Sequence, residues 1–506
     1  MDRPPRRPIS LAVHVVADIV LIGTMVWVGW LFARTVGPRL SYPFDLEWME
    51  GGMLTHALRV SQGLPLYVEP GPEFIPFIYP PLYPWVVGTL GRLGEVSYTL
   101  GRAVSVAGTV VACLLLVVGV ARERLRWTAG VAAAALFLSC YDEVGAFFDI
   151  VRTDGLLVAL LGGALLACRR ATRPMLATGG VFLALAFATK HSVAVLGIPI
   201  AIVLWREYGW RRALWFAAWS MGPALAFTLV MEIASQGRFL EYVLLVPATH
   251  PIVGQRVFPL SEKELASAFP LALAAAAVAL LFRFRHRSFG FRYWTPVALT
   301  GLVLVVLMRG HHGGYLNVLI PGFWLLSLLA GIGLGLGFRA HPLLHLALAG
   351  LVAHQVWSGG WTPSRYTPTQ ADRRAGEQVL DILRSYPGPV LMPHSPWYPV
   401  LVGKEPSFAL IALWDVTHSR TPFPDTNDRI AQALRERRYD AVILASERFR
   451  WGLNQSYERV RAITLPGRAL FPKTGWRARP RYVYEPRETP KAAAGPRAAP
   501  IEATGL

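Results

Sequence analysis

The chain has 506 residues, of which 53% are hydrophobic and only 16% are charged, and its mean hydropathy is +0.39. An average soluble domain carries roughly 25% charged residues, so this composition argues against a soluble protein and indicates a membrane protein. The formal net charge of +18 does not predict nucleic-acid binding, because many arginines lie in short loops between apolar runs, as in cytoplasmic loops of membrane proteins. The three cysteines lie in or beside apolar runs and indicate neither a disulfide framework nor a thiolate metal site.

Apolar runs near spanning length predict a multi-span α-helical membrane protein with about 11 spans. The basic N-terminus and the arginine-rich short loops place the N-terminus in the cytoplasm. The arginine-rich, lysine-poor usage suggests a bacterial protein, and we expect it in the inner (plasma) membrane. The spans are expected near 11–33, 98–120, 128–141, 155–168, 175–189, 191–205, 212–233, 264–282, 293–308, 315–337 and 341–357.

His14 and Asp18 lie four residues apart in the first span and are expected to pair inside the helical bundle. The first extracytoplasmic loop, 34–97, then contains two segments expected to form in-plane helices. Residues 48–60 have an amphipathic pattern, and residues 80–93 are short and rich in proline. A true span at 80–93 would turn every later arginine-rich loop outward, against the positive-inside pattern.

The C-terminal part of the chain changes character after the expected transmembrane catalytic domain at 1–357. Residues 358–370 are rich in Gly, Pro, Ser and Thr and read as a linker. Residues 371–486 show helix–strand alternation, which predicts a small α/β domain on the extracytoplasmic side. No glycine-rich phosphate loop occurs in it, and 487–506 reads as a disordered tail.

The motif FDLEWMEGG in the first outer loop supplies the leading catalytic candidate, Asp45. Carboxylates at a membrane surface are costly unless they are functional or paired. A carboxylate can accept a proton from an attacking hydroxyl, although a solvated loop acid or a helix N-cap would look the same in sequence. Glu47 and Glu50 are weaker candidates, because glutamate near a helix start also favours the helix dipole.

A second acidic cluster, YDEVGAFFDIVRTDG, lies in the next outer loop. Its candidates are Asp149, Arg152 and Asp154. Asp149 and Arg152 are three residues apart and are expected to share a helical face, either as a structural ion pair or as functional groups. Two acidic loops on one side of a membrane also provide oxygen ligands for a divalent cation, Mg²⁺ or Mn²⁺. No spacing fixes such a site, so the metal stays an open alternative.

Cationic side chains at the ends of later spans are candidates for contacting a lipid phosphate. Lys190 ends an apolar helix, where it either snorkels to the interface or binds phosphate as a point charge. Arg309, His311 and His312 form a similar polar group in MRGHHGGYLN. Adjacent histidines on a helix point apart, which favours substrate contact over metal ligation.

In the order of these motifs, the chain resembles the membrane glycosyltransferases of the GT-C fold. It is most similar to the branch that includes protein O-mannosyltransferases and the aminoarabinose transferases of lipid A. The resemblance covers roughly the first 210 residues, and the later spans match only in topology. Two positions depart from the family pattern, since Leu46 separates the acid pair and Tyr79 replaces the histidine before the proline pair. The matching motifs are Asp45-Leu46-Glu47, Tyr79-Pro80-Pro81-Leu82, Arg102, Arg152-Thr153-Asp154 and Lys190.

The resemblance implies an inverting transfer of a sugar from a polyprenyl-phosphate-linked sugar donor to a glycan, lipid or protein acceptor. In this hypothesis Asp45 is the base, and cationic groups stabilise the departing lipid phosphate. The positions expected to contact substrate are Glu47, Tyr79, Arg102, Asp149, Arg152, Asp154, Lys190, Arg309, His311 and His312.

Other functional classes fit parts of the same pattern. A flippase or transporter of lipid-linked sugars would place polar residues near the middle of its spans, whereas here most of them lie in outer loops. A polysaccharide polymerase or ligase with a diphosphate-linked donor is not distinguished by the sequence. An assembly protein, with the C-terminal domain binding partners, is a third alternative.

Overall fold

The computed structural model describes residues 8–256, 264, 267–285, 289–417, 420–447 and 451–487. The basic start of the chain and the expected disordered tail after residue 487 therefore lie outside the described residues. The chain forms two compact units, each assembled from segments that are distant in the sequence. Unit 1 comprises Met1–Gly37, Ala103–Phe227 and Pro251–Arg365, and unit 2 comprises Pro38–Arg102, Thr228–His250 and Tyr366–Leu506. The division at 358–370 expected from composition stays a prediction.

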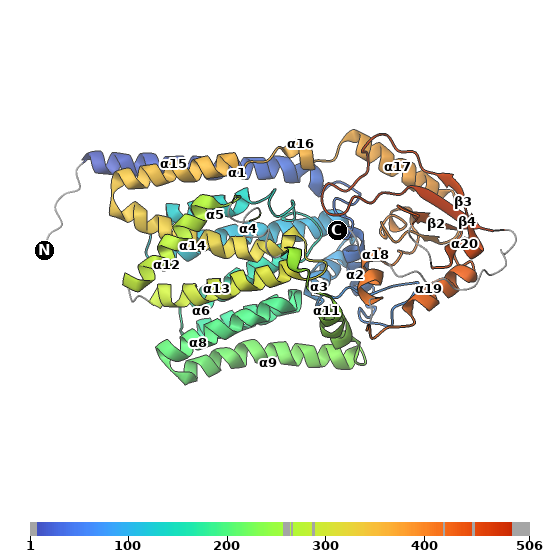
Figure 1. Ribbon diagram of the computed structural model, residues 1–506, viewed down its shortest axis with the longest axis horizontal. Helices are drawn as coiled ribbons and strands as arrows, with labels where there is room; N and C mark the ends of the chain where they lie inside the picture. Colours follow the sequence, from blue (N-terminus) through green and yellow to red (C-terminus); the bar gives the residue numbers. More distant parts are fainter. Residues whose placement is uncertain are drawn as a thin grey trace. The chain divides into compact units, whose positions relative to one another are not determined.

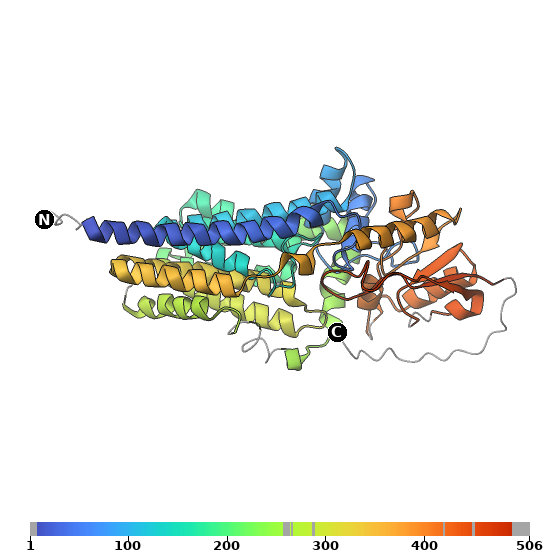
Figure 2. The same cartoon turned by 90° about the horizontal axis from the view of Figure 1, so that it is seen from above.

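Helices build unit 1, and one occurs at every predicted apolar run. Figures 1 and 2 show the long helices of this unit side by side with their axes roughly aligned. The elements, three of which extend into unit 2 or begin there, are α1 (Pro8–Leu40), α4 (Tyr98–Arg122), α5 (Trp127–Ser139), α6 (Asp154–Cys168), α7 (Arg173–Thr189), η1 (His191–Leu196), α8 (Gly197–Tyr208), α9 (Trp210–Ala234), η3 (Gly254–Arg256), α12 (Pro270–Arg285), α13 (Phe289–Gly310), η5 (Leu316–Leu319), α14 (Ile320–Ala340) and α15 (Pro342–Ser358).

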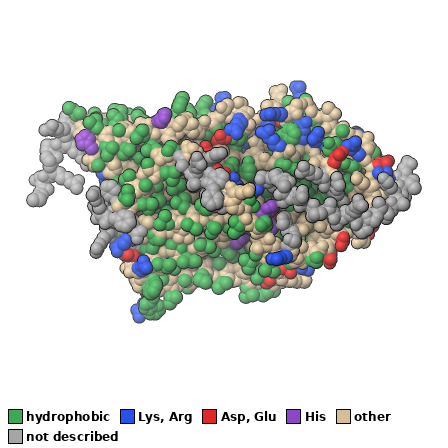
Figure 3. Space-filling view, viewed as in Figure 1, with side chains coloured by type: hydrophobic (Ala, Val, Ile, Leu, Met, Phe, Trp, Pro, Cys, Tyr) green, Lys and Arg blue, Asp and Glu red, His purple; other side chains and the backbone are tan. Residues whose placement is uncertain are grey.

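Within the described residues, five helices are long and apolar enough to cross a membrane: Ile9–Leu40, Tyr98–Arg122, Trp210–Ala234, Arg292–Gly310 and Leu316–Ala340. Shorter apolar helices occur at several of the other expected spans. The chain is thus a multi-pass membrane protein, while the number of eleven spans and the side that each loop faces stay predictions. Figure 3 shows hydrophobic side chains covering much of the surface over these helices, as a lipid-facing surface requires.

Burial separates a central helix of unit 1 from a peripheral one. The apolar part of α14 is 89% buried, whereas that of α1 is only 11% buried. Helices α4 and α6 approach each other most closely at two glycines. A Cβ at Gly108 would lie 2.4 Å from the backbone of Gly155, and a Cβ at Gly155 would lie 2.4 Å from the carbonyl oxygen of Ser105. Only glycine allows this contact, which fixes the start of α6.

Unit 2 joins the first predicted outer loop to the C-terminal segment. Its early helices are α2 (Glu50–Ser61) and α3 (Leu82–Gly91), at the two segments predicted to lie in the membrane plane. At 1.5 Å per residue the longer one measures about 18 Å, too short to cross the roughly 30 Å apolar core of a bilayer. They pack closely, since a Cβ at Gly88 would lie 2.4 Å from the Ala57 carbonyl oxygen.

The C-terminal segment contains a four-stranded sheet of order β1-β2-β4-β3. Strands β1 (Val390–Leu391) and β2 (Ala441–Leu444) are parallel, and β4 (Tyr482–Pro486) is antiparallel to both β2 and β3 (Tyr457–Ala462). The helix–strand order expected from sequence occurs twice, as α17 (Gln370–Arg384) before β1 and α19 (Thr426–Arg435) before β2. The remaining short elements are α10 (Arg238–Leu240), η2 (Glu241–Leu245), α11 (Val246–Thr249), α16 (Pro363–Tyr366), η6 (Val400–Val402), α18 (Leu410–Val416) and α20 (Leu453–Ser456).

Candidate active site

Asp45 lies buried in unit 2, with 4% of its surface exposed. Its Oδ1 accepts a hydrogen bond from the Tyr98 hydroxyl at 2.7 Å and another from the backbone N–H of Gly51 at 3.1 Å. Its Oδ2 is also buried and has no hydrogen-bond partner within the described ranges. One oxygen of the carboxylate is therefore fixed by two donors, while no donor within the described ranges holds the other.

Burial raises the pKa of the Asp45 carboxyl well above its usual range. The Tyr98 hydroxyl opposes this shift in the pKa, the charge of Glu50 adds to it, and Arg102 and the Gly51 N–H oppose it more weakly. A raised pKa makes a carboxylate a stronger base once it is ionised. Perturbation of this kind at a buried acid is typical of functional sites.

Glu50 and Arg102 form a fully buried ion pair beside Asp45. The Arg102 Nε donates to Glu50 Oε1 at 2.9 Å, and a terminal nitrogen of Arg102 donates to Oε2 at 2.7 Å. Three further bonds from the same guanidinium reach the carbonyl oxygens of Arg39, Tyr42 and Phe44 at 2.8, 2.5 and 2.7 Å. All five N–H donors of Arg102 are thus used within the protein.

The pair organises the loop that carries Asp45. Glu50 Oε2 also accepts from the backbone N–H of Leu46 at 2.6 Å, so the side chain that Arg102 holds in turn holds the backbone next to Asp45. Arg102 lies over the Tyr98 ring at 4.7 Å. This arrangement favours a positioning role for Arg102 over the substrate contact expected from the sequence.

Glu47 is 2% exposed and lies beside the C-terminal segment of unit 2. Glu47 forms an isolated parallel β-bridge with Thr474. The backbone N–H groups of Lys473 and Thr474 both donate to the Leu46 carbonyl oxygen. A Cβ at Gly475 would lie 2.8 Å from Glu47 Oε1. Glu47 is therefore enclosed by backbone of the segment 473–475.

Three tryptophans meet next to this loop. The ring centroids of Trp48 and Trp476 are 5.0 Å apart, and Trp414 lies 5.8 Å from Trp48 and 5.6 Å from Trp476. The buried His394 lies 5.5 Å from Trp476. Burial lowers the pKa of His394 to about 4, so this imidazole is neutral at physiological pH.

Tyr79, the residue before the proline pair, belongs to a segment that His56 ties to helix α2. The backbone N–H of Phe77 donates to His56 Nε2 at 2.8 Å, so Nδ1 carries the proton and donates to the Gly52 carbonyl oxygen at 2.7 Å. Burial lowers the pKa of His56 to about 4, which keeps this bridge neutral. The Tyr79 carbonyl oxygen accepts from the Tyr67 hydroxyl at 2.6 Å. The Tyr79 ring is half-buried.

In unit 1 the structure brings together two of the predicted residues, Asp154 and Lys190. Asp154 is the first residue of α6 and is 1% exposed. Its Oδ1 lies 3.4 Å from the Lys190 ammonium, and its Oδ2 accepts from the Asn317 side-chain amide at 3.0 Å. Lys190 remains 14% exposed. The imidazole of His191 lies near both Lys190 and His311.

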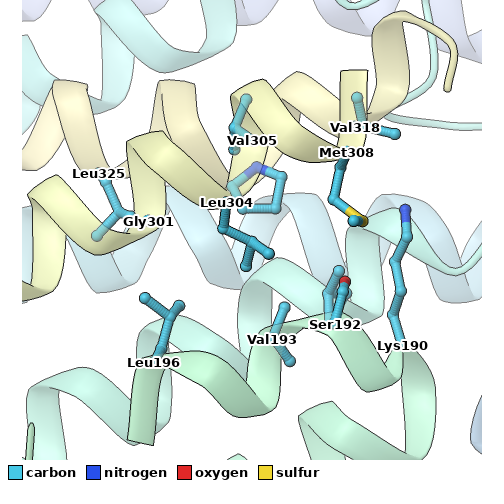
Figure 4. A pocket seen from close by; sticks show the side chains of 12 residues that line it. Lys190, Ser192, Val193, Leu196, Gly301, Leu304, Val305, Met308, Val318 and Leu325 are labelled. Atoms are coloured by element: carbon cyan, nitrogen blue, oxygen red, sulfur yellow. The ribbon is translucent and has the colours of Figure 1, made fainter. Parts of the chain in front are cut away.

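An apolar seam begins at Lys190. Figure 4 shows Lys190, Ser192 and Met308 at one end of this seam, with Leu196, Gly301 and Leu325 at the other. Its lining comes from α6, the α7–η1 turn, α13 and the start of α14. The seam is narrow, so an isoprenoid chain would have to part its flexible side chains. An ammonium at the end of an apolar seam is chemically suited to the phosphate end of a lipid.

Asp149 and Arg152 are buried in unit 1, but the prediction that they share a helical face is wrong. Residues 149–152 form bends, because α6 begins only at Asp154. The Tyr141 hydroxyl donates to Asp149 Oδ1 at 3.0 Å. The Arg152 carbonyl oxygen accepts from Ser105 at 3.1 Å, and its guanidinium lies 5.9 Å from the centre of the Phe147 ring.

Arg309 forms a two-bond ion pair with Glu264, at 3.0 and 2.7 Å, and also donates to the Gly314 carbonyl oxygen at 2.8 Å. It therefore clamps the turn after α13. His311 and His312 lie in this turn, where His311 bridges to Ile252 and the His312 N–H donates to Pro251. These bonds favour a positioning role for Arg309 over direct phosphate contact.

The described residues do not provide a donor set that matches the candidate Mg²⁺ or Mn²⁺ site. Across the ranges that the structure describes, no three His, Cys, Asp or Glu side chains are grouped so that they could hold a metal ion. Two acids of the second outer loop have other partners: Asp149 accepts from Tyr141, and Asp154 binds Asn317 and Lys190. We therefore derive no step through a metal.

Sequence reasoning missed the groups that tune the predicted residues. Neither Tyr98, at the start of an expected span, nor His56, in the expected amphipathic segment 48–60, was identified as a candidate from sequence. Asn317 lies in GYLNVL with no charged neighbour in sequence. An amide inside an apolar run was the one signal available, since a buried polar group requires a partner.

The long apolar helices define a multi-pass membrane protein, and similarity to solved structures identifies its fold as GT-C, as the sequence predicted. ArnT from Cupriavidus metallidurans in the apo state is similar over 92% of this chain and 97% of that chain, with 13% identity and a TM-score of 0.60. ArnT bound to undecaprenyl phosphate gives the same coverage and TM-score with 12% identity. At this identity the likeness shows the fold alone.

The archaeal oligosaccharyltransferase AglB from Archaeoglobus fulgidus, in complex with an inhibitory peptide and a dolichol-phosphate, is similar over 86% of this chain and 69% of that chain. Its identity is 12% and its TM-score is 0.49, too low to carry an argument. No protein-family model matches the chain, and a comparison with curated proteins finds no match.

Proposed function

We propose that this protein is an inverting glycosyltransferase that moves a sugar from a polyprenyl-phosphate carrier to an acceptor hydroxyl. The proposal places the reaction at the extracytoplasmic face of the bacterial inner membrane, with the N-terminus in the cytoplasm and residues 371–486 outside. The fold shared with ArnT supports it, as does the positive-inside distribution of arginines. The mechanism requires only that the acceptor provide a hydroxyl group. This hydroxyl belongs to a glycan, a lipid or a protein.

The observation that carries the proposal is the buried Asp45, with one oxygen held by two donors and the other without a donor among the described residues. In the proposed step, Asp45 Oδ2 takes the proton of the acceptor hydroxyl while that oxygen attacks the anomeric carbon. The bond from this carbon to the phosphate oxygen breaks, and polyprenyl phosphate leaves with the electron pair. A single displacement inverts the anomeric centre and needs one base, in contrast to a two-step retaining reaction.

Lys190 is assigned to the phosphate of the donor. Its ammonium is held by Asp154, so its position is fixed before substrate arrives. The apolar seam next to it accepts the first isoprene units. ArnT has been solved with undecaprenyl phosphate bound, which shows that a protein of this fold accommodates a lipid of this class. Negative charge grows on the phosphate as it departs, and a fixed cation stabilises that charge.

The remaining predicted residues divide into contact and positioning groups. Asp149, Arg152, His311 and Tyr79 stay candidates for contacting the sugar or the phosphate. Arg102 and Arg309 are assigned to positioning, because their guanidinium groups hold Glu50 and Glu264 and several backbone carbonyls. Glu47 and His312 are likewise assigned to positioning, because each bonds to the backbone of a neighbouring segment.

Asp45→Asn tests the proposal directly. We expect no release of polyprenyl phosphate from a labelled polyprenyl-phosphate sugar in the presence of acceptor. A matched control is Asp381→Asn, which removes a carboxylate that is 73% exposed on α17 and should leave the rate unchanged. Activity near the level of the unmodified protein in Asp45→Asn would contradict the role of this residue.

The same variant makes a stability prediction with a definite sign. Because the folded-state pKa of Asp45 is raised, its stability contribution is present at low pH and is lost as the pH rises through the folded-state value. Asparagine does not ionise, so Asp45→Asn should unfold at a higher temperature than the unmodified protein at neutral pH and at a similar one in acid. An inactive but more stable variant separates loss of chemistry from loss of folding.

Two substrate comparisons separate the alternatives. A flippase moves labelled donor across vesicle membranes without forming free polyprenyl phosphate, whereas the proposed enzyme forms it only when acceptor is present. A polymerase or ligase of the second alternative prefers a diphosphate-linked donor over the monophosphate. If the diphosphate-linked donor is turned over faster, the donor is a polyprenyl diphosphate sugar and not the proposed monophosphate. The role of Asp45 as the base would be unaffected.

A further inference from the structure

A second polar site lies in unit 1, at the opposite end of helix α14 from Asn317. The start of α1, the turn between α4 and α5, and the junction of α14 with α15 together form a recess of about 430 Å³. Helix α14 has 21 residues, so its two ends are separated by about 30 Å. This recess is thus distinct from the Lys190 seam, and the proposed transferase activity does not use it.

The lining of the recess is basic. Arg124, Arg126, Arg339, His14 and Ser10 contribute to it, and none of the described residues that line it is a carboxylate. Arg124 and Arg339 are exposed, and neither forms an ion pair with a carboxylate in the described part of the chain. Their only mutual bond runs from the Arg339 guanidinium to the Arg124 carbonyl oxygen. Two positive charges therefore face one recess without internal compensation.

Buried polar groups lie next to the arginines that line the recess. Arg126 pairs with Asp18, whose Oδ1 also accepts from Thr128 at 2.6 Å. The Nε of Arg126 is buried and has no hydrogen-bond partner in the part of the chain that the structure describes. His14 and the fully buried His345 share a bond of 2.9 Å between their Nδ1 atoms. This unmet donor lies on an arginine that lines the recess, and a buried polar group of this kind requires an acceptor.

The backbone of Arg124 adopts a conformation that favours glycine. Its φ is +59°, a left-handed conformation that non-glycine residues rarely adopt. Glycine would relieve this strain, so the arginine side chain is kept at a position where the fold alone favours another residue.

Exposed apolar side chains flank the recess and indicate the source of the ligand. Ile9 and Leu11 lie on either side of Ser10 on α1, and Leu343 and Leu344 follow the junction of α14 with α15. Figures 1 and 2 place the start of α1 and this junction at the same end of the helices. A basic recess bordered by lipid-facing side chains matches the headgroup and the first acyl carbons of a membrane lipid.

We propose that this recess binds the phosphate of an anionic phospholipid, with Arg124, Arg126 and Arg339 as its donors and the flanking leucines and isoleucine against the acyl chains. By the positive-inside pattern the site faces the cytoplasmic leaflet. The lipid would brace α1, which is the least buried of the five long helices, against α14 and α15.

The test is equilibrium binding to the purified full-length protein in neutral detergent, with three probes: short-chain phosphatidylglycerol, short-chain phosphatidylcholine and inorganic phosphate. Phosphatidylglycerol should bind and raise the unfolding temperature, and the other two should bind far more weakly. Equal binding of phosphatidylcholine would overturn the anionic preference. Inorganic phosphate that binds as tightly as phosphatidylglycerol would overturn the lipid as its source.

Two variants keep the result independent of folding. Arg124→Gln combined with Arg339→Gln should weaken phosphatidylglycerol binding roughly 30-fold, at about fivefold per arginine. The control is Arg122→Gln, which removes an exposed arginine nearby that does not line the recess. Arg124→Gly should weaken binding while leaving stability unchanged or higher. Full binding by the double variant, or an equal loss in the control, would refute the site.

Discussion

The hydroxyl of Tyr98 is the largest single influence that opposes the raised pKa of Asp45. Tyr98→Phe removes that hydroxyl and little else, because the ring and its contact with Arg102 remain. The backbone N–H of Gly51 then holds the same carboxylate oxygen alone. We expect the pKa of Asp45 to rise further, so that a smaller fraction of the enzyme carries the ionised base at a given pH.

The size of the effect follows from the strength of one hydrogen bond to a charged group. Such bonds contribute about 1.5–3 kcal/mol, and about 1.4 kcal/mol corresponds to a tenfold change in an ionisation equilibrium. On the acid side of the pH–rate profile, Tyr98→Phe should therefore be roughly 10- to 100-fold slower. At a pH high enough to ionise Asp45 in both proteins the rates should converge, because the reacting carboxylate is the same.

The assay is the pH dependence of kcat/KM for sugar transfer from a labelled polyprenyl-phosphate donor, since this parameter reports ionisation in the free enzyme. The matched control is Tyr83→Phe, which removes another buried tyrosine hydroxyl, one that donates to the Gly101 carbonyl oxygen. The control should leave the position of the acid limb unchanged. An acid limb that does not move in Tyr98→Phe, or one that moves equally in the control, would refute the role of Asp45 as the titrating base.

Three further changes test the framework around the site. Arg102→Met leaves Glu50 buried without its partner and should destabilise the protein by about 3–5 kcal/mol in thermal or denaturant unfolding; adding Glu50→Leu should restore only part of this, because Arg102 also binds three carbonyl oxygens. Lys190→Gln should lower kcat/KM for the lipid donor roughly 10- to 100-fold, while Lys190→Arg keeps the charge and most of the rate. Gly155→Ala should push α6 from α4 and reduce both activity and unfolding temperature, whereas Gly29→Ala, which has no atom within 4 Å of the added carbon, should not.

Much of the helical architecture was predictable because hydrophobic runs report directly on burial in lipid or protein. The predicted run at 155–168 corresponds to α6 at Asp154–Cys168, and the run at 212–233 to α9 at Trp210–Ala234. The short helices α2 and α3 were also predictable, from amphipathic spacing and from proline. Run length did not reveal that the expected span at 191–205 starts as a 3₁₀ turn, His191–Leu196.

The candidate site was predictable only as a set of polar residues. Asp154 and Lys190 were both identified, but their contact across 36 positions, and its completion by Asn317, depend on how α6, α7 and η5 pack. The prediction that Asp149 and Arg152 share a helical face is wrong because the backbone bends before α6 begins. Periodicity predicts which residues share a face only after the helix limits are known.

Three acids in one short motif acquire three different environments, and this explains why Asp45 is the one suited to act as a base. Glu50 is neutralised by Arg102, which has no donor left to offer a second carboxylate. Glu47 is enclosed by the backbone at 473–475. Among the described residues, the hydrogen-bond donors to Asp45 are neutral, Tyr98 and Gly51, so burial acts on it with no hydrogen-bonded counter-ion in that part of the chain and its pKa rises. The ion pair thus fixes the loop and also leaves the neighbouring carboxylate basic, a division that the letters FDLEWMEGG do not reveal because it depends on an arginine 52 residues away.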